Sequence, residues 1–262
     1  MTQSEYENLE KWYSNYFNGF CVQNDDIAEN IRLKRDHTFR VCNEAEKICA
    51  SIKLKEPDIL IAKTAALFHD VGRFEQYAKY RTFLDLKSVN HAELAIDILV
   101  RYHVLENLRE QEKKLIKKSI LLHNKKQLPS VLDEETLLFA RILRDADKLD
   151  IWKIVLEHYN GSNHSGNGAI EFGLPDTPGI SDGAYKSLLL ERLVDVSDIR
   201  NVNDFKLLLL GWVYDLNFSH SVQEVLNRKY VEQLQQFLPK NDKMKKIISV
   251  IKEYAKRKLS EE

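Results

Sequence analysis

Six side chains of the types that bind metal ions and move protons recur in successive segments of this 262-residue chain. They lie in the stretches HTFRV, LFHDVGRFEQY, NHAELA, LLHNK and DADKLD, and they are His37, His69, Asp70, His91, His123 and Asp147. Each falls on or beside an otherwise apolar stretch, where an unpaired histidine or aspartate would cost several kcal/mol. A shared divalent ion would satisfy all of them, because neutral imidazoles and carboxylates are its usual ligands.

Simpler explanations exist for each residue alone. His69 fits a hydrogen-bonded core histidine, His37 fits a hydrogen-bond network with Arg40 one turn on, and Asp147 fits one of several acids on a solvated face. The recurrence of the pattern in consecutive helix-forming segments favours the shared site over these separate explanations.

Helices are predicted wherever apolar residues recur with the helical period. In the first 160 residues they cover 25–51, 57–70, 89–105, 110–124 and 134–159. The segment 57–70 is apolar on nearly every side and is expected in the middle of a bundle. Gly72 is predicted to end it in a left-handed conformation, and 73–88 to form a loop with a short turn.

The second part of the chain begins with a glycine-rich loop. Residues 160–183 hold six of the nine glycines and two of the five prolines. Further helices are predicted over 184–199, 201–216, 220–238 and 243–259. We therefore expect a single all-α domain over 1–262, with a helical core at about 25–160 and a C-terminal helical extension at 184–262.

Composition excludes several classes of protein. Hydrophobic residues make up 44% and charged residues 30%, and 39 basic against 40 acidic side chains give a net charge of −1. This balance argues against a protein that binds nucleic acid polymers by general attraction. No apolar run approaches the length of a membrane span, and the N-terminal residues do not resemble a signal peptide. Cys21, Cys42 and Cys49 form no CxxC pair, and a reducing cytoplasm is the expected location.

The chain from about 36 to 152 resembles the HD-domain superfamily of metal-dependent phosphohydrolases. HTFRV is similar to the H-x-x-R-V opening segment of that family, AALFHDVGR to its ALLHDIGK segment and ADKLD to its AD-x-L segment. The resemblance implies an all-helical bundle that holds a divalent metal through His37, His69, Asp70 and Asp147.

His91 and His123 bear on the number of ions. In two-metal branches of the superfamily the HD aspartate bridges two ions and additional histidines complete the second, so the resemblance implies Asp70 as the bridge. In single-metal members such histidines contact the phosphate or the attacking water. Two ions are favoured over one, and the expected metal is Mn, Fe, Ni, Co, Mg or Zn.

A phosphate substrate also needs cationic partners. Arg73, three residues past Asp70, offers a bidentate fork, and Lys148 is next to the last ligand. Arg40 is equally well explained as structural. The predicted catalytic residues are Asp70, Arg73 and Lys148. The predicted substrate-binding residues are Arg73, Arg81, Thr82, Ser88 and Lys148.

The resemblance implies hydrolysis of a phosphomonoester or phosphodiester in a nucleotide or other small phosphorylated metabolite. No GYP tripeptide follows the HD segment, which argues against the cyclic-di-GMP phosphodiesterases of the superfamily. The alternatives are a di-iron HD-type oxygenase that cleaves a C–C or C–P bond and a non-enzymatic signalling module. No membrane partner is expected, and a homodimer is left open.

Overall fold

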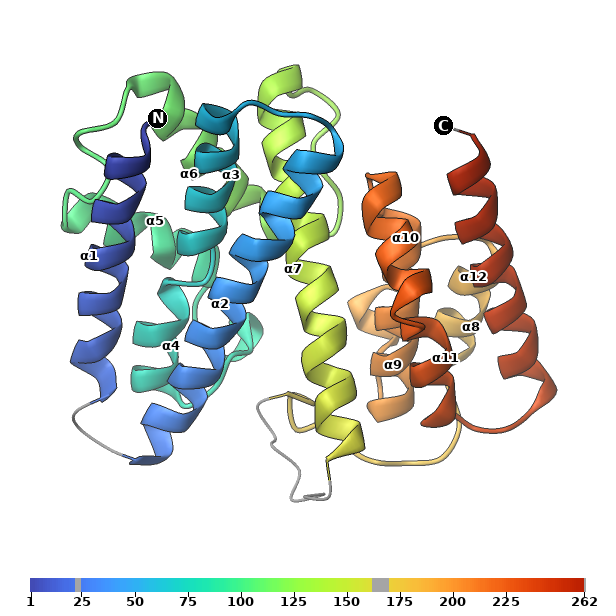
Figure 1. The fold of residues 1–262 in the computed structure, drawn as a ribbon. Helices are drawn as coiled ribbons and strands as arrows, with labels where there is room; N and C mark the ends of the chain where they lie inside the picture. Colours follow the sequence, from blue (N-terminus) through green and yellow to red (C-terminus); the bar gives the residue numbers. More distant parts are fainter. Residues whose placement is uncertain (22–24, 162–169, 262) are drawn as a thin grey trace. The chain divides into compact units, whose positions relative to one another are not determined.

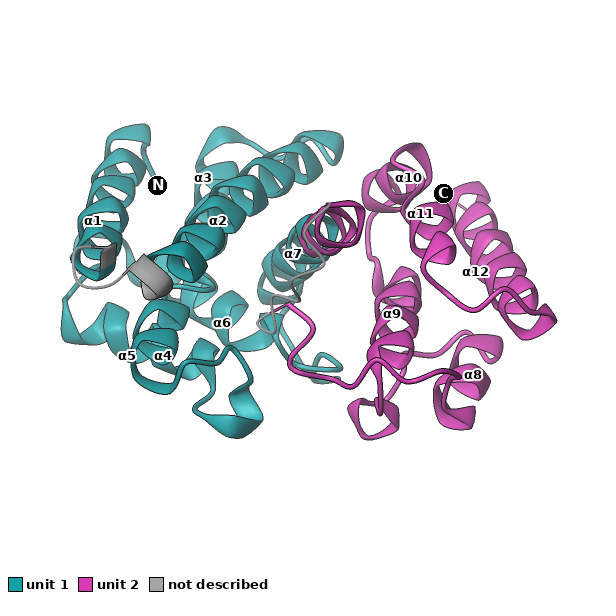
Figure 2. Cartoon of the chain, turned by 90° about the horizontal axis from the view of Figure 1, so that it is seen from below, with its two compact units in different colours: residues 1–150 teal, residues 151–262 magenta. Residues whose placement is uncertain are grey.

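The computed structural model describes residues 1–21, 25–161 and 170–261, and every element in these ranges is a helix. The predicted all-α class is confirmed. The chain divides into two compact units, residues 1–150 and 151–262 (Figure 2). Part of the predicted glycine-rich loop, 162–169, lies outside the described residues.

The first unit is a bundle in which α2 packs against α1 and α3, and α6 packs against α3 and α5 (Figure 1). α4 packs on α5 and α2. The α-helices that begin in this unit are α1 (Gln3–Cys21), α2 (Asp25–Ser51), α3 (Glu56–Phe68), α4 (Gly72–Tyr80), α5 (His91–Arg101), α6 (Glu110–His123) and α7 (Glu134–Asn160). A short 3-10 helix, η1 (Asp85–Lys87), lies between α4 and α5.

α3 is buried along nearly its whole length, as its apolar sequence predicts. Pro57 lies in its first turn. Backbone N–H groups in the first turn have no acceptor within the helix, so the lack of an N–H in proline costs no hydrogen bond there. From Leu60 to Phe68 every residue except Lys63 is buried. The helix is therefore held from several sides, and the residues that follow it, His69 and Asp70, are delivered into the interior of the unit.

The turn after α3 is braced by α1. Phe68 and Phe74 lie on either side of the HD dipeptide, and the ring of Tyr13 in α1 contacts both, with centroid distances of 6.2 and 5.7 Å. Tyr13 is fully buried. Aromatic packing of this kind fixes the position of the turn as well as burying area.

The prediction for Gly72 was wrong. Gly72 has no positive φ and is the first residue of α4, a helix that the sequence analysis placed in a loop. A Cβ at Gly72 would lie 2.3 Å from the carbonyl oxygen of His91 and 2.9 Å from the nitrogen of Ala95. The glycine is required because the backbones of α4 and α5 approach closely here. The left-handed residue is Arg81, which ends α4 with a φ of 56°.

The second unit contains α8 (Asp182–Leu189), α9 (Val202–Gly211), α10 (Ser219–Asn227), α11 (Tyr230–Gln236) and α12 (Asp242–Ser260), with two short 3-10 helices, η2 (Val196–Asp198) and η3 (Trp212–Asp215). The predicted helix over 184–199 ends at Leu189. The one over 220–238 is divided in two by Lys229, whose φ is 54°. Left-handed residues of this kind are hard to foresee where no glycine marks them.

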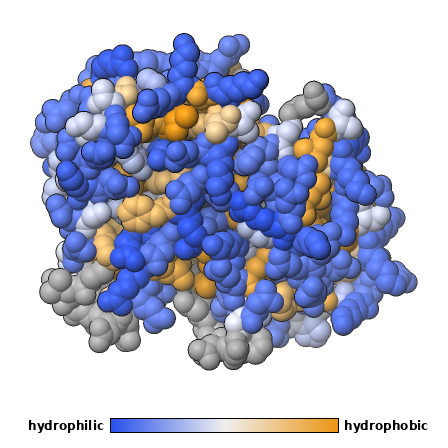
Figure 3. All heavy atoms as spheres, in the orientation of Figure 1, coloured by the Kyte–Doolittle hydropathy of each residue, from blue (hydrophilic) through white to orange (hydrophobic). Residues whose placement is uncertain are grey.

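None of the described helices combines the length and the apolar composition needed to cross a membrane. On the face drawn in Figure 3, hydrophilic residues predominate and apolar residues show in smaller areas between them.

Candidate metal centre

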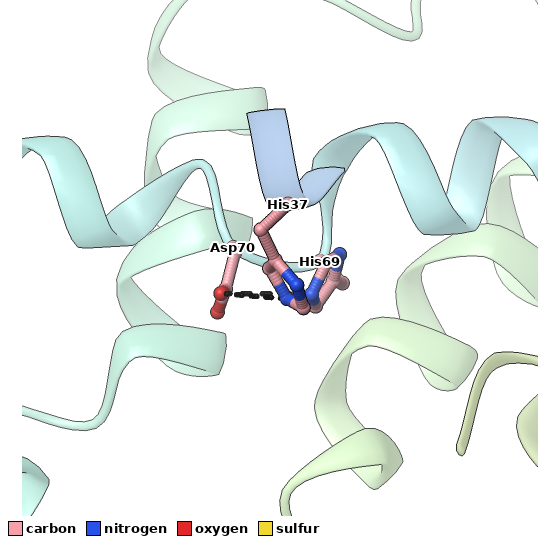
Figure 4. A group of neighbouring side chains, drawn as sticks. All are labelled: His37, His69 and Asp70. Carbon is pink, nitrogen blue, oxygen red and sulfur yellow. Dashed lines mark ion pairs between the residues drawn. The ribbon is translucent and has the colours of Figure 1, made fainter. Parts of the chain in front are cut away.

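The six candidate ligands, from five separate segments, come together in the first unit. His37 lies in the middle of α2, and His69 and Asp70 follow α3 directly (Figure 4). The other three are the first residue of α5, the last of α6 and a residue in the middle of α7: His91, His123 and Asp147. Their ligand atoms form three overlapping groups, within each of which all atoms lie less than 4.8 Å apart: His37, His69 and Asp70; His69, His123 and Asp147; Asp70, His91 and His123.

Asp70 presents its two oxygens to different histidines. Oδ2 lies 3.6 Å from Nε2 of His37 and 3.6 Å from Nε2 of His69, whereas Oδ1 lies 3.4 Å from Nε2 of His91. On the first side, Asp147 Oδ1 lies 3.1 Å from His37 and 3.6 Å from His69. One oxygen of Asp70 thus faces His37 and His69, and the other faces His91.

The tautomers of two histidines follow from their hydrogen bonds. Nδ1 of His69 lies 2.7 Å from the carbonyl oxygen of Ala66, and Nδ1 of His123 lies 2.6 Å from that of Ile120. A carbonyl only accepts, so Nδ1 carries the proton in both rings. In the neutral ring, Nε2 is then left with a free lone pair directed into the cluster.

Carboxylates orient the other two histidines in the same way. Nδ1 of His37 lies 2.7 Å from Asp150 Oδ2, and Nδ1 of His91 lies 2.7 Å from Asp85 Oδ2. Burial opposes ionisation of Asp85, but the hydrogen bond from His91 and the charge of Arg73 lower its pKa to about 2. The pKa of Asp150 is also lowered against burial by its hydrogen bond to His37. Pairs of carboxylate and histidine are the usual outer support of a metal-binding imidazole.

The inward nitrogens need a cation. Among the residues that the structure describes, Nε2 of His37 and of His69 are buried without a hydrogen-bond partner. Nε2 of His91 and of His123 lie 3.0 Å apart, and burial lowers the pKa of His123 to about 3. Facing lone pairs repel each other, and a divalent ion bound to both nitrogens would remove this repulsion. The donor set therefore fits divalent metal ions.

Comparison with protein families supports this assignment. The family described as HD domain matches residues 35–152, a segment that contains all six candidate ligands. This chain carries an HD domain. Comparison with curated proteins and with solved structures gave no match. The HD domain indicates the superfamily of metal-dependent phosphohydrolases, and the cluster of histidines and aspartates indicates a divalent-metal site.

Helix ends position two ligands of the HD domain. Asn90 caps α5, and its side-chain oxygen accepts from the backbone nitrogens of Ala92 and Glu93. This cap starts the helix at His91 and so fixes where the ring lies.

The end of α6 is held by a buried arginine of α7. Arg144 Nη1 donates to the carbonyl oxygens of Leu122 and His123, in the last turn of α6, and of Lys125, just beyond it. Carbonyls at the end of a helix lack the helical N–H groups that would otherwise bond them. A cation is also favoured at this end by the helix dipole. Arg144 thereby fixes the last turn of α6, which carries His123.

Arg73 lies beside the cluster but is held by protein groups. Its Nε donates to Asp70 Oδ1 at 3.2 Å, and its Nη1 donates to Gln76 at 2.8 Å and Asp85 at 2.9 Å. Nη1 also donates at 2.5 Å to the carbonyl oxygen of Phe83. In this arrangement the guanidinium orients Asp70 and Asp85, and contact with a substrate stays a prediction.

Two other cations of the sequence analysis have defined contacts. Lys148 is buried, and its Nζ donates to the carbonyl oxygen of Arg144 at 3.3 Å. Arg40 donates to both oxygens of Asp150, at 2.6 and 3.1 Å. The structure therefore favours the structural explanation of Arg40, which supports His37 through Asp150.

Three of the predicted substrate-binding residues, Arg81, Thr82 and Ser88, lie in the segment between α4 and α5. Arg81 is exposed at the end of α4. Thr82 Oγ1 accepts from the backbone nitrogen of Leu84, and Ser88 Oγ donates to the carbonyl oxygen of Leu84 and accepts from Gln76. These contacts order the segment, and its role in substrate binding stays a prediction.

Sequence reasoning missed several residues that lie around the ligands: Lys34, Gln76, Asp85, Arg144 and Asp150. Lys34 is three residues before His37, and Asp150 is three after Asp147, so the helical period places each near a ligand. That spacing is a usable signal. Asp85 and Gln76 carry no such signal, because only the fold brings η1 and α4 to His91.

Proposed function

We propose that this HD domain hydrolyses a phosphoester bond in a nucleotide or another small phosphorylated metabolite. The observation that supports the proposal is the cluster formed by the Nε2 atoms of four buried histidines and the carboxylates of Asp70 and Asp147. A divalent ion held there would acidify a bound water and polarise a phosphoryl oxygen.

We infer two ion positions from the two faces of Asp70. Oδ2 and Asp147 face His37 and His69, and Oδ1 faces His91, which is joined by His123. Two divalent ions carry four positive charges and two aspartates carry two negative charges, so the ions and carboxylates together would have a charge of +2. That charge suits a phosphate dianion better than the neutral site that a single ion would leave.

The surrounding residues prepare these donors. Asp85 and Asp150 hold a proton on Nδ1 of His91 and His37, which keeps each Nε2 available. Arg73 holds Asp70 so that Oδ1 faces His91. We retain Lys148, beside Asp147, as the proposed catalytic cation.

We expect a small substrate because the basic and acidic side chains of the chain are balanced. A homodimer and a cytoplasmic location stay predictions. Sedimentation velocity measures the first, and imaging of a tagged chain measures the second.

The test begins with protein purified without chelator. Its metal content is measured first, and phosphomonoesters, phosphodiesters and nucleotides are then tried with the metals found. Asp70→Asn is expected to abolish the activity. Asp97→Asn, at an exposed position of α5, is the matched control and is expected to behave as wild type.

The outcomes separate the proposal from its alternative. Phosphatase or phosphodiesterase activity that Asp70→Asn retains would reject this site. Two irons per chain, with oxygen consumption on a diol or phosphonate and no hydrolysis of phosphoesters, would instead support the di-iron oxygenase.

A further inference from the structure

Lys34 is a cation at the metal centre that the ligand set does not use. It lies on α2, three residues before His37, and its Nζ is 2.7 Å from Asp70 Oδ2. The lysine side chain is 15% exposed, whereas that of Asp70 is 4% exposed. The Lys34 side chain is therefore more accessible to solvent than the carboxylate that it contacts.

The oxygen that Lys34 contacts is one that we assign to an ion. Asp70 Oδ2 also lies 3.6 Å from Nε2 of His37 and of His69. A divalent ion among these atoms would neutralise the carboxylate and repel the ammonium. The contact between Lys34 and Asp70 would then weaken when the site is loaded.

Lys34 is held by fewer contacts than Arg73. The structure gives Lys34 one hydrogen-bond acceptor among the described residues, Asp70, and its Nζ lies 5.4 Å from the centroid of the Phe83 ring. Arg73 donates to Gln76, Asp85 and a backbone carbonyl as well as to Asp70. A lysine has a flexible stem and three donors, which suits a point contact to phosphate.

We propose that Lys34 is the residue that binds a non-bridging phosphoryl oxygen of the substrate, and that it is held by Asp70 until metal ions take that carboxylate. The identity of the anion rests on the proposed function. The competition between Lys34 and metal for Asp70 rests only on the geometry.

The test compares Lys34→Met, which keeps the apolar stem, with Lys34→Arg, which keeps the charge. Lys63→Met is a matched control, because Lys63 pairs with Glu46 at 2.8 Å, is 20% exposed and lies 5.1 Å from the Tyr6 ring. Metal affinity and the affinity of the metal-loaded protein for inorganic phosphate are measured by calorimetry.

We expect Lys34→Met to bind metal about tenfold more tightly, because a competing cation is removed. We expect it to bind phosphate on the order of tenfold more weakly, because a charge-assisted hydrogen bond is lost. Lys34→Arg should keep most of the phosphate affinity, and Lys63→Met should match wild type in both measurements.

Two results would overturn the proposal. Unchanged phosphate affinity in Lys34→Met, with wild type binding phosphate normally, would reject the role of Lys34 alone. Weaker metal binding in Lys34→Met would show that the lysine supports the site instead of competing for it. If metal-loaded wild type neither binds phosphate nor hydrolyses any phosphoester, the proposed function fails, and the substrate role of Lys34 fails with it.

Discussion

His91 Nε2 and His123 Nε2 lie 3.0 Å apart, although each ring uses its Nδ1 proton elsewhere, on Asp85 and on the carbonyl oxygen of Ile120. Two facing lone pairs are unfavourable in a buried site unless a cation lies between them. The helix ends that carry these rings are capped by Asn90 and Arg144. The two nitrogens are thus held close together by capped helix ends despite their repulsion. This arrangement is expected of a site that a metal ion completes.

Metal content should depend on this pair of histidines. Wild-type protein is expected to bind two divalent ions per chain, and a His91→Ala, His123→Ala double variant is expected to bind one, by elemental analysis after dialysis. His103→Ala is the control, because His103 is exposed and paired with Glu106. Equal metal content in the double variant and wild type would remove these histidines from the ligand set.

Asp150 and Asp85 should act on different ion positions. Asp150→Asn is expected to weaken metal binding at His37 by about 10- to 100-fold, since it replaces the carboxylate that orients the ring with a neutral amide, which is a weaker acceptor. Asp85→Asn should have a similar effect at His91. Titration with a spectroscopically visible ion such as Co²⁺ should show one weakened step in each variant. If both variants weaken the same step, the assignment of two positions is incorrect.

Gly72→Ala should damage both stability and site. Its Cβ would lie 2.3 Å from the carbonyl oxygen of His91. Because this atom belongs to the backbone, the clash can be relieved only if α4 and α5 move apart. We expect a loss of about 1–3 kcal/mol in the free energy of unfolding, measured in urea.

Gly19→Ala provides the contrast, because Gly19 lies in α1 with nothing within 4 Å of the added Cβ. This substitution should be neutral or should stabilise by about 0.5–1 kcal/mol. A Gly72→Ala variant as stable as Gly19→Ala would show that α4 and α5 do not pack this closely.

Glu112 should make the stability depend on acid pH. Its side chain is 4% exposed and accepts from the backbone nitrogen and Nε of Arg109, both at 3.0 Å. Burial opposes ionisation, but these hydrogen bonds lower its pKa from 4.5 to about 2. A lowered carboxyl pKa stabilises the fold above the unfolded pKa, and this stabilisation is lost as the pH falls from about 4.5 toward 2.

The measurement is urea unfolding of wild type and Glu112→Gln at a series of pH values. The wild type should be more stable near neutral pH, and the difference should shrink below about pH 4. Glu110→Gln, at an exposed position that pairs with Lys113, should show a much smaller dependence. A constant difference between wild type and Glu112→Gln across the series would rule out the ionic contribution.

The all-α class and the candidate ligands were predictable from the pattern of amino acids. Helical periodicity reports which residues of a segment face the interior, so polar groups on apolar helices stand out without any structure. His37, His69 and Asp147 were visible for this reason, and the structure brings them together with Asp70.

The residues that support those ligands became evident only from the packing of the helices. Arg73 was expected at the phosphate, yet its donors are directed to Asp70, Asp85 and Gln76. Lys34 was not expected at the site, yet its ammonium contacts Asp70. Periodicity describes a helix relative to its own axis, whereas these contacts depend on how separate helices are rotated and spaced. That information arises only when the whole bundle packs.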